Sequence, residues 1–222
     1  MAAKLEVAIE VGPKGKKCVA VARDWPGLSR GAANEELAVA RLLSYVPRYA
    51  AVAELAGLSL DAGETEVVER YEGTGSTDFW GISFAFSEYD RQPMSSDELE
   101  RELSLMQASW RFFDEVRARV SAEMRKGPRG GGRDRDRIVH HVLANEYDWG
   151  KQVGVRREDD EVPWDAESLA RHREAYCEGF RAFHGEGKSA GKSPLRFLIR
   201  HTAFHTLDHA WEMEDKDLSS EG

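Results

Sequence analysis

The stretch Arg200-His-Thr-Ala-Phe-His-Thr-Leu-Asp-His-Ala-Trp-Glu212 decides how the C-terminal part of this chain is interpreted. It holds three of the protein's 7 histidines, His201, His205 and His209, at intervals of four residues. Since a helix turns by about 100° per residue, each four-residue step moves a side chain by only about 40° around the axis. All three imidazoles are therefore predicted on one side of one helix. This spacing lets two ring nitrogens reach one metal ion, so the sequence predicts a metal site.

The helix that carries these histidines is predicted to begin at Ser193-Pro194, where an N-cap serine is followed by proline at the first helical position. Its inward face is expected to contain Leu198, Thr202, His205, His209 and Met213. His205 and His209 lie in the middle of this stripe, whereas His201 lies at its margin.

A second helix, predicted from about Asp134 to Lys151, carries two further histidines, His140 and His141. His141 lies at the edge of its apolar stripe, while His140 points to the opposite side. We therefore expect the metal ligands to be His141, His205 and His209. Three histidines with coordination positions left open are typical of a catalytic metal site.

Other interpretations of these polar residues stay open at this point. A structural site would be closed by a fourth protein ligand, for example His201 or Glu212. The histidines could also be hydrogen-bonded core or surface residues, with no metal. His140 and His201 are alternate ligands. Glu146 and Asp208 could orient the ligand histidines by hydrogen bonds, or they could be surface charges.

The chain from residue 93 to residue 222 is predicted to be all helix. A capping box at Ser95–Glu98 begins a long amphipathic helix that ends before the loop Gly127–Arg133. Further helices are expected over about 134–151, about 165–184 and from 193 onward. Four helices joined by loops of this length predict an all-α antiparallel four-helix bundle.

Residues 1–92 are predicted to form an α+β module with the order β-β-α-β. Leu5–Val11 alternates apolar and polar residues, and Gly12–Gly15 is a turn signal before a second strand at Cys18–Ala22. A helix is expected from Asn34 to about residue 58, with Pro47 predicted to kink or split it. Strands are expected over 64–71 and 79–86.

The composition is ordinary for a globular protein of one large or two small domains, with 222 residues, 41% hydrophobic and 32% charged. A net charge of -9 disfavours broad nucleic-acid binding, which usually needs a basic face. No apolar run approaches the roughly 20 residues of a membrane span, and the N-terminus lacks the apolar core of a signal peptide. With only Cys18 and Cys177, no disulfide framework is expected. We therefore expect a cytoplasmic protein without nucleic-acid or membrane partners.

Two segments resemble a known family. His141-Val-Leu-Ala-Asn-Glu-Tyr-Asp-Trp149 resembles the second helix of the DinB-like (damage-inducible, YfiT-like) four-helix bundle family, and His201–His209 is similar to its last helix. The resemblance covers about residues 93 to 215. It implies a divalent metal held by one histidine of helix two and two of the last helix, which are His141, His205 and His209 here. One departure is Ala210–Glu214, where family members often have arginine, glycine and glutamine, so any substrate contact made by that run is in doubt.

The resemblance implies a function as well as a fold. Several members of the family resemble thiol-dependent transferases or isomerases that use mycothiol, bacillithiol or glutathione, while many have no known activity. The implied cofactor is zinc, nickel or iron, which would lower the pKa of a bound thiol or water and so make a nucleophile for transfer or hydrolysis. Arg200 and Arg196 could contact an anionic small-molecule substrate, although such residues are more often solvated. A homodimer is one assembly that the sequence allows.

The N-terminal region resembles a second family over a shorter stretch. Residues 7–58 are similar to the HicB-type β-β-α module, with Trp25-Pro-Gly-Leu-Ser-Arg-Gly31 after the second strand and paired acids at the start of the helix. HicB-type modules serve in antitoxins and as accessory domains. The alternative function is therefore a non-catalytic metal-binding or interaction protein, antitoxin-like through this module. A plain hairpin-and-helix packing domain is the simpler interpretation, since no DNA-binding segment is evident.

Overall fold

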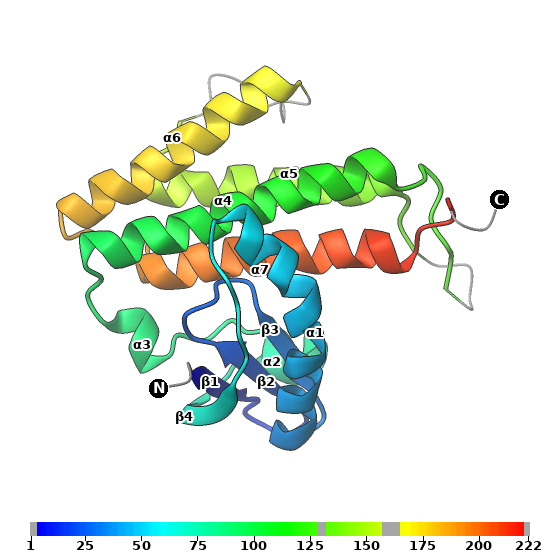
Figure 1. The fold of residues 1–222 in the computed structure, drawn as a ribbon. Helices are drawn as coiled ribbons and strands as arrows, with labels where there is room; N and C mark the ends of the chain where they lie inside the picture. Colours follow the sequence, from blue (N-terminus) through cyan, green and yellow to red (C-terminus); the bar gives the residue numbers. More distant parts are fainter. Residues whose placement is uncertain (1–3, 128–131, 157–164, 220–222) are drawn as a thin grey trace.

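The computed structural model describes residues 4–127, 132–156 and 165–219, so most of the predicted loop Gly127–Arg133 lies outside the described residues (Figure 1). The described chain begins with a small mixed sheet of four strands and continues into helices, with seven α-helices in these ranges. The predicted α+β class is confirmed at this level.

The sheet contains β1 (Lys4–Val11), β2 (Cys18–Ala22), β3 (Ser29–Ala32) and β4 (Glu64–Glu72) in the order β3-β2-β1-β4. β1 and β2 form the predicted antiparallel hairpin, and β4 pairs with β1 in parallel. A parallel pair needs a long crossover, which here includes α1 (Glu35–Leu55). The side chain of Asn34 caps α1 by accepting from the Leu37 amide at 2.9 Å, and the helix continues through Pro47 without being split.

Two elements of the N-terminal region differ from the prediction. β3 pairs with β2 and was not predicted, because its four residues carry no alternating pattern. The strand predicted over 79–86 is wrong, since this segment contains the end of α2 (Gly75–Trp80) and a loop. Thr74 begins α2 with a capping box, and Gly81 ends it at φ 72°, a left-handed conformation that glycine adopts readily.

The C-terminal region holds the long helices. After α3 (Glu88–Arg91) come α4 (Ser96–Arg119), α5 (Arg135–Gly150), the short 3-10 helix η1 (Lys151–Val153), α6 (Ala166–Gly185) and α7 (Leu195–Asp215). The predicted capping box at Ser95 and Glu98 is confirmed. The colours in Figure 1 show that α4 and α7 run in one direction and α5 and α6 in the other, with α6 crossing the rest obliquely. Consecutive helices α5 and α6 are therefore not antiparallel.

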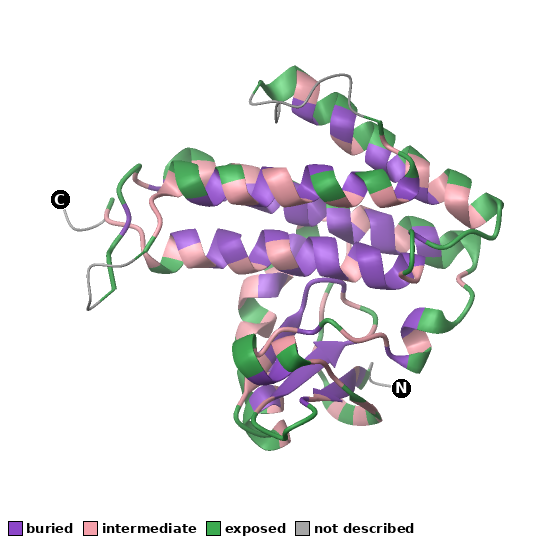
Figure 2. Ribbon diagram, turned by 180° about the vertical axis from the view of Figure 1, so that it is seen from behind, coloured by how far each residue is buried: buried purple, intermediate pink, exposed green. Residues whose placement is uncertain are grey.

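The N-terminal region and the long helices share one hydrophobic core. Buried residues from the sheet, from α1 and from α4, α5 and α7 form one cluster, which includes Leu5, Leu42, Phe113, Ile138 and Trp211. The helix α7 lies against the sheet region, and buried positions run along its length (Figure 2). A side chain on α7 can therefore face either the long helices or the N-terminal region. In the described part of the chain, no helix is long and apolar enough to cross a membrane.

Candidate metal centre

Three histidines meet where α5 packs against α7. His141 comes from α5, His205 and His209 come from α7, and each offers one ligand nitrogen within 4.8 Å of the others. The Nε2 atoms of His141 and His205 are 3.0 Å apart, and the ring centroids of the three pairs are 4.7 to 4.9 Å apart. Two nitrogens bound to one tetrahedral metal at about 2.05 Å would lie about 3.3 Å apart. The spacing therefore fits ligands of a single ion.

Glu212 holds one of these rings, that of His209, by a hydrogen bond. Nδ1 of His209 donates to Glu212 at 2.6 Å, which leaves Nε2 with its lone pair available. Lys216 and Arg133 lie beside the same carboxylate, at 2.6 and 3.6 Å. The hydrogen bond from His209, with support from Lys216, lowers the pKa of Glu212 to about 2. Glu212 thus acts as a positioning residue for His209, which differs from the closing ligand considered from the sequence.

Asn145 is a contact that sequence reasoning missed. Its Nδ2 donates to the His141 carbonyl at 2.8 Å and lies 3.4 Å from Nδ1 of the same ring. The signal was present in the sequence, because residues four apart on a helix are neighbours.

The protonation of the histidines suits metal binding. Burial, together with the neighbouring His209, lowers the pKa of His141 to about 4, and the same causes lower the pKa of His205 to about 2. Both rings are neutral at pH 7 and keep a lone pair, which a metal requires of its histidine ligands. Nδ1 of His205 is also buried without a hydrogen-bond partner among the described residues. An all-imidazole donor set suits zinc, nickel or iron, so the residues fit the implied metal.

His201 lies outside this cluster although it shares the helix. It is 6% exposed, stacks on Phe197 at 12° between ring planes, and touches the edges of Trp149 and Phe84. Aromatic rings thus surround His201 one turn before the cluster. The structure does not bring it to the other three histidines, and this corrects its prediction as an alternate ligand.

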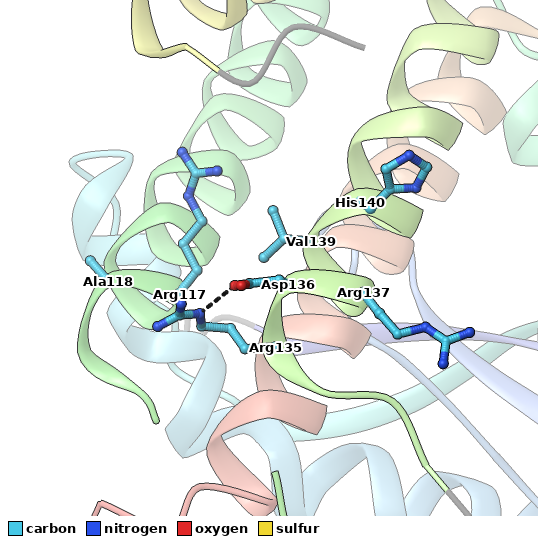
Figure 3. Close-up of a pocket in the computed structure, with 7 residues that line it drawn as sticks. All are labelled: Arg117, Ala118, Arg135, Asp136, Arg137, Val139 and His140. Carbon is cyan, nitrogen blue, oxygen red and sulfur yellow. Dashed lines mark hydrogen bonds and ion pairs between the residues drawn. The ribbon is translucent and has the colours of Figure 1, made fainter. Parts of the chain in front are cut away.

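His140 is exposed and points away from the cluster. It lines a cavity of about 730 Å³ between α4 and α5, together with Arg117, Arg135 and Arg137 (Figure 3). Arg117 pairs with Asp114 and Arg135 with Asp136, so these two lining cations already have carboxylate partners. None of the three clustered histidines lines this cavity, and His140 is not positioned as a ligand.

Glu146 does not orient a metal ligand. It is buried, and both of its oxygens accept from Arg173, at 2.9 and 3.2 Å. Arg173 also donates to Asp114 at 2.6 Å. This ion-pair network ties α5 to α6 and α4, so the predicted role of Glu146 behind a ligand is replaced by a structural one.

The structure also reassigns Arg200 and Asp208. The guanidinium of Arg200 holds Asp90 with two hydrogen bonds of 2.7 Å, and it donates to Ser83 and to the Ala85 carbonyl. These contacts join α7 to the N-terminal region, in place of the predicted substrate contact. Asp208 lies 3.4 Å from Arg30 and does not contact a histidine of the cluster in the described structure.

Comparisons with known proteins leave this site to be interpreted from its own residues. No protein-family model matches the chain, and neither a curated protein nor a solved structure matches it.

Proposed function

We propose that this protein is a DinB-like metal-binding protein, and that it acts as a metal-dependent enzyme on a low-molecular-weight thiol and a small electrophile. The observation that carries the proposal is the convergence of His141, His205 and His209 within 4.8 Å. The order of α4, α5, α6 and α7 supports a DinB-like bundle, with ligands from its second and last helices. Zinc, nickel or iron would be held there.

The donor set favours catalysis over a purely structural role. Among the described residues, no carboxylate or thiol joins the three histidines in the candidate group. Three protein ligands leave a coordination position for water or a thiol, as in catalytic zinc sites. When bound, the metal would lower the pKa of a coordinated thiol or water and so supply a nucleophile at neutral pH.

The protein's own residues prepare the site for this chemistry. Glu212 holds the Nδ1 proton of His209, and Asn145 holds the backbone of His141. Trp149 packs its ring 5.0 Å from that of His205 and so limits water on that side. These contacts fix the imidazoles before a metal binds, which reduces the ordering that binding would otherwise require.

Metal content measured on untagged protein tests the proposal. Wild type, His205→Ala and His209→Ala would be reconstituted with zinc, nickel or ferrous iron, and His140→Ala would serve as the matched control. We expect near-stoichiometric metal in wild type and His140→Ala, and loss of metal in the other two without unfolding. Equal metal in all four proteins would contradict the assignment.

Activity would be measured next on the loaded protein. Glutathione, cysteine and, as bacterial thiols, bacillithiol and mycothiol would each be offered with a chlorodinitrobenzene acceptor. We expect thioether formation that requires metal and is absent in His205→Ala. Metal binding without any turnover would instead support a non-catalytic metal-binding role.

A further inference from the structure

A second polar site lies on another side of α7, where the N-terminal region meets it. A cavity of about 170 Å³ is lined by β3, by α1, by the end of α2 with the loop after it, and by α7. Its lining includes Arg30, Arg41, Trp80, Phe204 and Asp208. Neither the fold nor the proposed metal centre accounts for this combination of cations and aromatic rings.

Arg30 is the unusual residue of this cavity because it is a buried cation with an incomplete set of partners. Its side chain is 4% exposed, and its guanidinium lies 3.7 Å from the ring centre of Tyr45 and 4.5 Å from that of Trp211. Nη1 donates to the Ser29 carbonyl at 2.7 Å and to Asp208 at 3.4 Å. Nε and Nη2 have no hydrogen-bond partner among the described residues.

A buried charge usually requires a close counter-ion, and the protein supplies only a weak one here. Asp208 is about half exposed, and its 3.4 Å contact is long for a charge-assisted hydrogen bond. The two rings fix the plane of the Arg30 guanidinium, whose positive charge acts on the cavity although Nε and Nη2 are shielded from solvent. This corner of the cavity therefore favours an anion.

Further positive charge lies at the edge of the cavity. Arg41 donates from Nη1 to the Gly31 carbonyl at 3.0 Å, which places its guanidinium beside the same strand as Arg30. Among the described residues that line the cavity, Asp208 is the only carboxylate, against two arginines. The local excess of positive charge contrasts with the net charge of -9 for the whole chain.

The other wall of the cavity is aromatic. Trp80, which lines the cavity, is 66% exposed, and its ring centroid lies 4.4 Å from that of Phe79, an exposed neighbour that is not part of the lining. This wall is held firmly, because Gly31 and Gly81 approach so closely that a Cβ on Gly31 would lie 2.2 Å from the Gly81 carbonyl oxygen. Two adjacent exposed aromatic rings beside the two arginine side chains indicate a surface for an apolar group.

We propose that this cavity binds a small organic anion, a carboxylate on an apolar or aromatic body, with the carboxylate beside Arg30 and Arg41 and the body against Trp80 and Phe204. Its volume of about 170 Å³ is below the roughly 300–1,000 Å³ of pockets for drug-sized ligands, so a small acid fits better than a whole cofactor. Binding of the anion itself does not depend on a metal.

Benzoate and benzamide are matched probes for the anion site, because they share a shape and differ in charge. Calorimetric titration of metal-free protein is expected to show benzoate binding at least about tenfold more tightly than benzamide, the loss expected when a charged hydrogen-bonded pair is removed. Equal binding of the two probes, or no benzoate binding up to about 10 mM, would overturn the proposal.

Variants locate the binding. Arg41→Gln, at an exposed position, and Trp80→Leu are each expected to weaken benzoate binding about tenfold, while the exposed Arg171→Gln on α6 serves as the control. Arg30→Lys keeps the charge but loses the planar donors, and its folding is checked by thermal unfolding. Unchanged benzoate affinity in folded Arg41→Gln and Trp80→Leu would contradict this location. Because the protein is metal-free, failure here is distinct from failure of metal uptake.

Discussion

The two halves of α7 treat their buried polar groups differently. In the first half, each buried cation has a carboxylate partner: Arg196 donates to Glu102 at 2.5 Å, and Arg200 holds Asp90. In the second half, His205 and His209 face His141, and no carboxylate of the described chain belongs to this group of ligands. In the first half of α7, carboxylates therefore neutralise the buried arginines. In the second half, the lone pairs of the histidine nitrogens remain available to a ligand.

This difference separates polar groups that stabilise the fold from polar groups that are available to bind a ligand. The ion pairs of the first half lock α7 to α4 and to the N-terminal region. Burial lowers the pKa of His205 in the second half, and that of His141 facing it from α5, so both of these imidazoles are neutral at pH 7. Clusters of groups with perturbed pKa values that lack an internal structural purpose are candidates for function.

Breaking the structural half should have the largest effect on stability. Arg200→Met would leave Asp90, which is 2% exposed, as an unpaired buried carboxylate. We expect a loss of about 3–5 kcal/mol in the free energy of unfolding, measured with urea. The double variant Arg200→Met/Asp90→Leu should recover part of that loss. Arg171→Ala breaks an exposed pair and should cost less than about 1 kcal/mol; a similar loss in Arg200→Met would refute the comparison.

Acid should weaken the metal-free protein through its buried neutral histidines, and His201 in the first half contributes beside His141 and His205. Burial lowers the pKa of His201 from 6.5 to about 4, so the folded state binds fewer protons than the unfolded state between these values. The resulting stability is complete above pH 6.5 and is lost as the pH falls toward 4, by roughly 3 kcal/mol.

Urea unfolding at several pH values measures this effect. His201→Phe keeps the aromatic contacts and removes the titrating group, so its stability should depend less steeply on pH than that of wild type. Parallel pH curves for the two proteins would show that His201 does not carry the effect.

Zinc should stabilise the protein through the second half only. A ligand that binds the folded state alone adds about 2.7 kcal/mol at 100 times its Kd, which for a chain of this size raises Tm by about 5–10 °C. His205→Ala should lose the zinc-dependent shift, whereas His201→Phe, one turn earlier, should keep it. Loss of the shift in both variants would mean that the two halves do not differ as described.

The smallest effect is expected on metal affinity, from changing Glu212, which accepts a hydrogen bond from His209. Glu212→Gln weakens the acceptor of the Nδ1 proton, and loss of such a partner typically lowers metal affinity about 10–100-fold. Zinc affinity would be measured by competition with a chelator. Glu214→Gln on the same helix is the control, because Glu214 pairs with Arg48 and Arg119 and not with a histidine. Equal affinity in the two variants would remove the positioning role of Glu212.

Local signals in the sequence were enough for several elements. The capping box at Ser95 was expected from its neighbours alone, and the β1–β2 hairpin followed from alternation and a turn. The meeting of His141 with His205 and His209 was also predicted, because helical periodicity assigns each histidine to a face. These predictions depend on residues a few positions apart.

Features set by distant residues were not predicted. The strand expected over 79–86 was wrong for a local reason, since capping at Thr74 and the left-handed Gly81 favoured helix and loop over the apolar run. Glu146 and Arg200 looked like candidates for the site from their positions beside histidines. Their partners, Arg173 and Asp90, lie 27 and 110 residues away, so sequence spacing carries no sign of them.

Neighbouring residues were enough to predict the helical faces, the capping box at Ser95 and the set of histidines that share a side, since periodicity and capping are local properties. The N-cap predicted at Ser193 is wrong, because Pro194 occupies the N-cap position of α7 and makes no side-chain cap hydrogen bond. The tertiary structure alone decided which charges are neutralised: Arg200 by Asp90, Arg196 by Glu102, and Arg30 only weakly by Asp208. The physical reason is that a buried charge is compensated by whatever packing brings within about 3 Å, and that distance is set by the fold rather than by the order of residues.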